Sequence, residues 1–129
     1  MSTNPIRSFK DLDVYKTLYK AAIIFLKEIL PKLPEEEKYN LKEQGRRACM
    51  APLAIIAEGY AKKHQKRAWK KYLEDALGER NEMITHLSLI KDLYSHLVDP
   101  KLCDYLIEMY DISGKQLYRL GESWTNFKK

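Results

Sequence analysis

Residues 39–59 read YNLKEQGRRACMAPLAIIAEG, and the second half of this stretch is apolar on every side. No charged residue occurs from Ala48 to Ala57. A helix of a small bundle buries one stripe about a hundred degrees wide, so a helix without a polar face needs neighbours on more than one side. The stretch therefore predicts a central helix that contacts another subunit, with Ala54 and Ile56 at that contact.

Small residues recur along the same stretch and would let other backbones approach closely: Gly45, Ala48, Ala51, Ala54 and Ala57. Gly59 follows them, and glycine commonly ends a helix because it adopts the left-handed conformation without strain. We therefore expect the helix to stop at Gly59 or a few residues beyond it.

Apolar residues continue at helical spacing on both sides of this stretch, as far as Trp124. They predict helices over about residues 11–32, 35–61, 65–97 and 100–126. Pro34 and Pro100 stand where proline is favoured, at the first position of a helix. An N-terminal arm, residues 1–10, precedes a single domain, residues 11–129. Four helices joined by short turns predict an all-α, up-down-up-down four-helix bundle.

Composition narrows the class of protein. The chain has 129 residues and a formal net charge of +5, which suits one domain with one core. Its first residues lack the apolar segment of a signal peptide, and no apolar run is long enough to span a membrane. We expect a cytoplasmic protein in which Cys49 and Cys103 stay reduced and partly buried.

Three blocks in the sequence carry a family resemblance. They are Ser8-Phe9-Lys10-Asp11-Leu12-x-Val14-Tyr15, then Arg46-Arg47-Ala48 with Ile56-Ala57-Glu58-Gly59, then Trp69-x-x-Tyr72-Leu73-x-x-Ala76-Leu77-Gly78-x-x-x-Glu82. In this order and spacing they resemble the four-helix-bundle proteins encoded by intervening sequences in bacterial 23S rRNA genes. The tail after Pro100 is also similar to the last helix of the related accessory proteins of diversity-generating retroelements. The resemblance implies a homopentamer, a ring-like oligomer.

Two carboxylates fall inside these blocks, Glu58 and Glu82. Buried carboxylates must be paired, so we expect both to make structural hydrogen bonds or ion pairs, with Arg46 or Arg47 as partners. Another acid, Glu79, stands where the family often has serine.

The clearest functional signal is a basic stretch of ten residues without an acid: Lys62, Lys63, Lys66, Arg67, Lys70 and Lys71, with His64 among them. Cations at a helix N-terminus oppose the helix dipole, so placing six there is unfavourable unless a partner compensates. Phosphate is the natural counterpart, and the stretch predicts binding of RNA or DNA. A solvated helix start on a protein-interaction or structural module is the alternative.

Catalytic motifs are scarce. Arg80 and His86 match the Arg-x-x-x-x-x-His spacing of HEPN-type ribonucleases, which gives a second alternative. No Glu-x-x-His pair occurs, so the ligand set of a di-iron bundle is missing and we expect no metal or other cofactor. The sequence thus predicts a non-enzymatic oligomer that binds nucleic acid, and the family resemblance implies that it acts as an accessory either to a reverse transcriptase or to rRNA.

Overall fold

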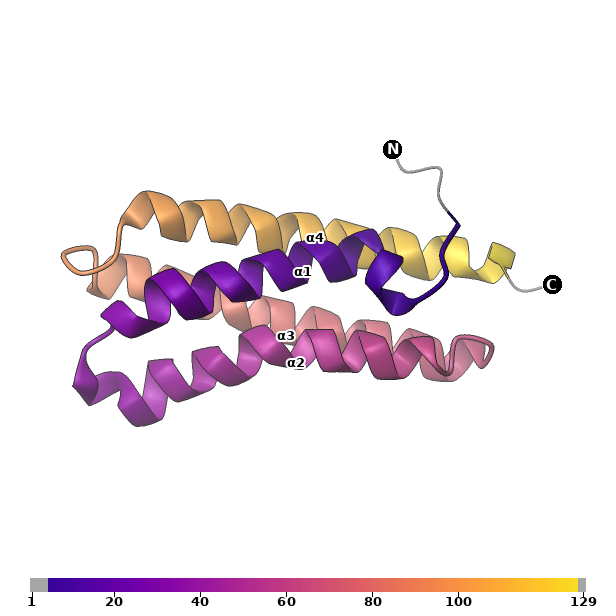
Figure 1. The fold of residues 1–129 in the computed structure, drawn as a ribbon, viewed down its shortest axis with the longest axis horizontal. Coiled ribbons are helices and arrows are strands. Elements are labelled where there is room, and N and C mark those ends of the chain that lie inside the picture. Colours follow the sequence, from indigo (N-terminus) through magenta and orange to yellow (C-terminus); the bar gives the residue numbers. More distant parts are fainter. Residues whose placement is uncertain (1–4, 128–129) are drawn as a thin grey trace.

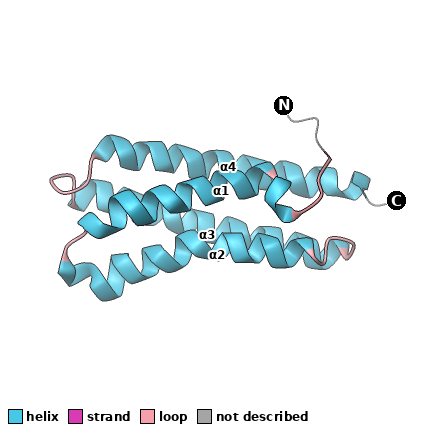
Figure 2. Cartoon of the chain, viewed as in Figure 1, coloured by secondary structure: helices cyan, strands magenta, loops and turns pink. Residues whose placement is uncertain are grey.

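Four helices lie side by side and run alternately in opposite directions (Figure 1). The computed structural model describes the backbone of residues 5–127 and the side chains of residues 5–123. Its main elements are α1 (Asp13–Ile24), α2 (Glu43–Tyr60), α3 (Lys66–Leu93) and α4 (Pro100–Phe127). α2 packs on α3, α3 on α4, and α1 on both α4 and α2. Short loops join the helices, and residues 5–127 contain no strand (Figure 2). The prediction of an all-α four-helix bundle is confirmed.

Short helical turns lengthen α1 and α2 to nearly the expected bounds. α1 continues through a π-helical turn, η2 (Phe25–Ile29), and a 3-10 turn, η3 (Leu30–Lys32). A 3-10 turn, η4 (Glu35–Glu37), and a π-helical turn, η5 (Lys38–Lys42), lead into α2. Pro34 between the two segments is extended, with φ −70° and ψ 157°. Its missing amide donor is compatible with that position, because the preceding helix has already ended.

The N-terminal boundary differs from the expected one, because a separate 3-10 turn, η1 (Phe9–Asp11), precedes α1. The Ser8 hydroxyl accepts a hydrogen bond from the Lys10 amide, and the Asp11 carboxylate accepts one from the Ser8 amide. Leu12 then adopts an extended conformation with its side chain buried, so α1 begins at Asp13. Residues 1–4 of the predicted arm and the side chain of Trp124 lie outside the described part of the chain.

α3 ends at Leu93, four residues before the predicted end. Tyr94 leaves the helical conformation, with φ −128° and ψ 32°, and its hydroxyl donates a hydrogen bond to the Glu37 carboxylate. Val98, in the turn that follows, is almost fully buried. Apolar periodicity does not show that α3 ends at Leu93. Leu97 and Val98 continue the apolar pattern, although they lie in the turn beyond the helix.

All four helices contribute buried side chains to one core, the largest of which are Trp69, Tyr110, Phe25 and Leu18. Cys49 and Cys103 lie in this core as free thiols, as expected. Burial raises the pKa of the Cys49 thiol to about 11, so that thiol is protonated and unreactive at neutral pH.

α2 ends within the range expected from the sequence, but Gly59 is not the left-handed residue that caps it. α2 continues to Tyr60, and no described glycine has a positive φ angle. A Cβ atom at Gly59 would lie 2.6 Å from Cβ of Tyr72 and 2.9 Å from the Trp69 ring. The expected left-handed capping role is therefore wrong, because the glycine is needed for the close approach of α3 to α2.

We expect Gly59→Ala to lower the free energy of unfolding by about 1–3 kcal/mol, because the added methyl group overpacks a rigid contact. Chemical denaturation followed by circular dichroism measures the change. Gly78→Ala is the matched control, since Gly78 lies in α3 and a methyl group added there would enter open space. There alanine should stabilise the helix by about 0.5–1 kcal/mol. Equal effects of the two substitutions would contradict the packing role of Gly59.

Candidate nucleic-acid interface

Six cations gather at the end of the bundle where α2 turns into α3, the right-hand end of Figure 1. Lys62 and Lys63 lie in the turn, and the other four occupy the first two turns of α3. We call this set the basic end: Lys62, Lys63, Lys66, Arg67, Lys70 and Lys71. All six side chains are exposed except that of Lys63, which is partly buried.

Half of the basic end is engaged by neighbouring side chains. Lys71 forms an ion pair of 3.0 Å with Asp75, which raises the pKa of the lysine. Lys62 donates a hydrogen bond of 3.2 Å to the Tyr72 hydroxyl. The ammonium group of Lys63 lies 4.3 Å from the centre of the Tyr60 ring, within the range of a cation–π contact.

The other three cations, Lys66, Arg67 and Lys70, have no acidic partner in the described part of the chain. The helix terminus that carries them adds to the positive charge. Gln65, at the N-cap of α3, makes no side-chain hydrogen bond, and the first turn of α3 contains no acid. The amide groups of this turn and the three side chains therefore present positive charge that no ion pair in the described part of the chain neutralises.

A groove of about 710 Å³ runs beside the basic end, between α3 and α4. Lys63, Lys66 and Lys70 line it, together with Glu74 and Glu122. The rest of its lining is largely apolar or aromatic: Trp69, Leu73, Leu77, Leu117 and Tyr118, with Gly114 and Gly121. Lysines and glutamates both line this apolar groove. The groove therefore differs chemically from the part of the basic end outside it, where Arg67 is exposed.

The residues expected either at a subunit contact or in the family blocks of α2 divide into two groups. Ile56 was expected at the contact and lies in the core of the chain instead, because its side chain faces the other helices. Ile56 and Gly59 are buried within the chain itself, whereas Arg46, Ala54 and Glu58 are exposed on the outer side of α2. Neither the Arg46 side chain nor the Glu58 side chain forms an ion pair in the described part of the chain. The expectation that Glu58 is buried and paired within the fold is therefore wrong, because position 58 falls on the face that α2 turns away from the core.

Arg47 and Glu82 meet the expectation for paired residues of the family blocks. Arg47 donates hydrogen bonds to Glu82 and, at 3.0 Å, to Glu79, so its guanidinium group joins α2 to α3. Glu82 also accepts from Nε2 of His86 at 3.3 Å. Glu79, which replaces the family's serine, thus supplies a second carboxylate for the same arginine.

Arg80 and His86 do not form a common site. Six residues of α-helix place two side chains about 120° apart, so the pair faces two different neighbours. Nε of Arg80 donates to the Tyr110 carbonyl at 2.7 Å, and another guanidinium nitrogen contacts Asp111 at 2.9 Å. Arg80 therefore braces α4, whereas His86 contacts the Glu82 carboxylate beside α2. This role of Arg80 was not predicted from the sequence. The one hint in the sequence was Gly114 in α4. A Cβ atom at position 114 would lie 2.7 Å from the Arg80 guanidinium group, so the glycine leaves room for it.

The described residues bring together no group of three His, Cys, Asp or Glu side chains that could hold a metal ion. Among the helices that the structure describes, none combines the length and apolar composition needed to cross a bilayer.

The sequence model of the 23S rRNA-intervening sequence protein family matches residues 10–119. The chain belongs to this family. A comparison with curated proteins gave no match. The matched range contains the basic end, the Arg47–Glu82 ion pair and Gly59, so the family model covers both the braces of the fold and the candidate interface.

The ion pair predicts how stability depends on pH. Hydrogen bonds from Arg47 hold the pKa of the Glu82 carboxyl below its usual value. A depressed folded-state pKa stabilises the fold above the unfolded-state pKa, and this contribution disappears as the pH falls through the folded-state value. At pH 7 we expect Glu82→Gln to lower stability by less than about 1 kcal/mol, because both partners are partly exposed.

Thermal unfolding of the variant and of the unmodified chain should converge as the pH is lowered from 7 to about 3. Glu108→Gln is the control, since Glu108 is exposed and has no partner among the described residues. A difference at position 82 that persists in acid would show that packing, and not the ion pair, is responsible.

Proposed function

We propose that the chain assembles into a ring-like homo-oligomer and binds nucleic acid through its basic end, without catalysing a reaction. The observation that carries this proposal is the exposed set Lys66, Arg67 and Lys70, which lacks acidic partners in the described structure. Lysine and arginine that are neither paired nor buried are free to neutralise phosphates and to release their counterions. Such contacts position nucleic acid but carry little sequence information.

Assembly is supported by the outer face of α2. Four exposed residues follow one another at intervals of four along this helix: Arg46, Met50, Ala54 and Glu58. Met50 is 49% exposed, and the two apolar positions lie between residues of opposite charge. A stripe with an apolar centre and charged ends is suited to a subunit contact. The family resemblance implies five copies, and we propose a homopentamer on that basis.

The cellular role that fits these properties is that of a cytoplasmic accessory protein, acting with a reverse transcriptase or with rRNA. No residue is proposed to be catalytic and no cofactor is proposed. Arg80 and His86 contact different elements, so a ribonuclease using them would first have to break the bonds from Arg80 to α4. Genomic neighbourhood distinguishes the two contexts, because a reverse transcriptase gene or an rRNA gene would lie beside or around this one.

The groove between α3 and α4 favours a second candidate function, docking of a protein. Its apolar lining, with lysines and glutamates at the edges, matches the composition of a helix-binding groove more closely than that of a phosphate site. A protein-binding module would use this groove and would leave Arg67, on the outer side, without a role.

Replacing Lys66, Arg67 and Lys70 together with glutamine should weaken binding to duplex DNA and structured RNA. The slope of log affinity against log salt should flatten by about one unit for each phosphate that is no longer neutralised. Fluorescence anisotropy over a salt series measures both quantities. Circular dichroism should show unchanged helicity, because the three side chains are exposed.

The matched control replaces three exposed lysines near the opposite end of the bundle, Lys27, Lys32 and Lys101, and so removes the same charge. We expect a much smaller loss of affinity from this control. Equal losses from the two variants would mean that net charge alone drives binding, and no binding at low salt would favour the protein-docking function.

Light scattering at micromolar concentration should report a mass several times the 15.2 kDa of one chain. Ala54→Glu should lower that mass, because a charge would be buried without a partner at the subunit contact. The single chain should tolerate this substitution, since Ala54 is exposed. Ser95→Glu, in the exposed turn after α3, adds the same charge as a control. A monomeric unmodified protein would rule out the proposed assembly.

A further inference from the structure

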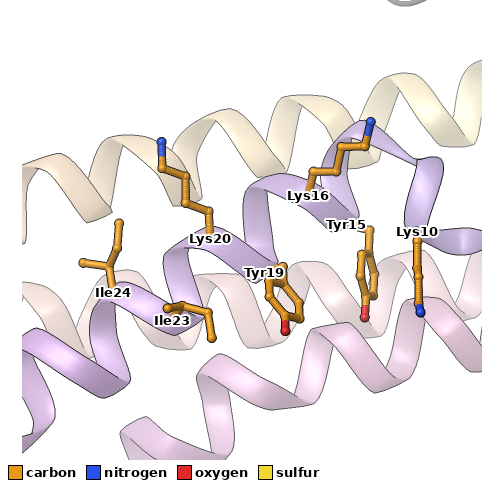
Figure 3. Close-up of a pocket in the computed structure, with 7 residues that line it drawn as sticks. All are labelled: Lys10, Tyr15, Lys16, Tyr19, Lys20, Ile23 and Ile24. Carbon is orange, nitrogen blue, oxygen red and sulfur yellow. The ribbon is translucent and has the colours of Figure 1, made fainter.

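A second basic surface lies on the outer face of α1, far along the sequence from the basic end. Seven residues line a hollow of about 760 Å³ there: Lys10, Tyr15, Lys16, Tyr19, Lys20, Ile23 and Ile24 (Figure 3). We call this surface the α1 hollow. None of its lining residues is acidic, which sets it apart from the groove between α3 and α4.

Aromatic rings form a row along the α1 hollow. The Phe9 ring packs edge-on against Tyr15, with centroids 5.1 Å apart, and so holds the Tyr15 ring in place. Tyr19 follows one turn later, 6.1 Å from Tyr15 and tilted by 32°. The Tyr19 side chain is 49% exposed, so a face of this row is open to a flat ligand.

Lysines extend to both sides of α1 around the aromatic row. Lys10 extends to the same side of α1 as the two tyrosines, whereas Lys16 and Lys20 extend to the other side (Figure 3). None of the three forms an ion pair within the described part of the chain. The nearby Asp11 carboxylate accepts hydrogen bonds from the backbone amides of Arg7 and Ser8, which lower its pKa; the charge of Lys16 lowers that pKa further, although the two side chains form no ion pair.

We infer that the α1 hollow binds single-stranded nucleic acid, with unpaired bases stacking on Tyr19 and Tyr15 and the lysines contacting phosphates. Aromatic rings beside unpaired cations are what sequence-tolerant single-strand sites share, because every base has a flat face and every nucleotide a phosphate. A duplex keeps its bases stacked on one another and cannot use the tyrosines. This inference rests on the proposed function, to which it adds a second site selective for unpaired segments.

A protein partner fits this surface less well. Lysine is depleted at protein–protein interfaces, yet three of the seven lining residues are lysines. A protein would also have to supply several carboxylates to match them, whereas a single strand supplies one phosphate per nucleotide. Another copy of the chain could still cover the exposed Tyr19 and Ile23, and the mass of the assembly distinguishes that arrangement from a nucleic-acid site.

The test compares Tyr19→Leu, which removes the ring but keeps apolar bulk, with Tyr19→Phe, which keeps the ring. The probe is a single-stranded oligonucleotide of about 12 residues, within the site sizes of known single-strand binders, carrying 2-aminopurine. Tyr19→Leu should lower its affinity by about tenfold and reduce the quenching of 2-aminopurine, because one base loses its stacking partner. Tyr19→Phe should behave like the unmodified protein, and Lys10→Gln should weaken binding while leaving the quenching in the bound state unchanged.

Duplex binding and mass are measured on the same variants. We expect Tyr19→Leu to leave both the affinity for duplex DNA and the mass from light scattering unchanged. Unaltered single-strand affinity and quenching in Tyr19→Leu would overturn the inference. A fall in mass would also overturn it, by showing that the α1 hollow is a subunit contact. The variant with glutamine at Lys66, Arg67 and Lys70 tests the proposed function separately. If it bound duplex DNA as tightly as the unmodified protein, only the proposed function would be contradicted, because the tyrosine variants leave the basic end intact.

Discussion

The close approach of α3 to α2 at Gly59 is the constraint on which the rest of the structure depends. Tyr72 and Trp69 rest directly against the backbone of α2, at distances that no side chain at position 59 would permit. Because the helices touch here, the chain needs only the short turn of residues 61–65 to reverse its direction. The cations on either side of the turn are consequently held together at one end, where their fields add.

Two arginines extend this contact across the bundle. Arg47 joins α2 to the carboxylates of α3, and Arg80 joins α3 to a carbonyl and a carboxylate of α4. The planar guanidinium group donates several hydrogen bonds in fixed directions, which suits it to bridging two helices. Both arginines are thereby committed to the fold. The cations that remain for a ligand are mostly lysines, whose flexible ammonium groups suit phosphate contacts that need no fixed geometry.

The sequence predicted features that depend on local pattern and missed those that depend on distant contacts. Apolar periodicity and prolines located all four helices, and the family blocks led us to expect Glu82 to pair with Arg46 or Arg47, of which Arg47 is the partner. Gly59 was misread because its neighbour, Tyr72, comes from another helix. Glu58 was misread because a single stretch does not reveal which side of α2 faces the core. The α1 hollow was missed because Lys16 and Lys20 look scattered until Tyr15, Tyr19 and Lys10 are placed beside them.

Repetition in an oligomer would change what such modest surfaces can do. Three unpaired cations at one end of a chain give weak, salt-sensitive affinity for a phosphate backbone. Copies held in a ring make each further contact intramolecular, so the overall affinity rises steeply although no single contact improves. The α1 hollow would add a contact available only to unpaired bases. Structured RNA contains duplex and single-stranded segments side by side, and an assembly with both surfaces would therefore favour it over uniform duplex DNA.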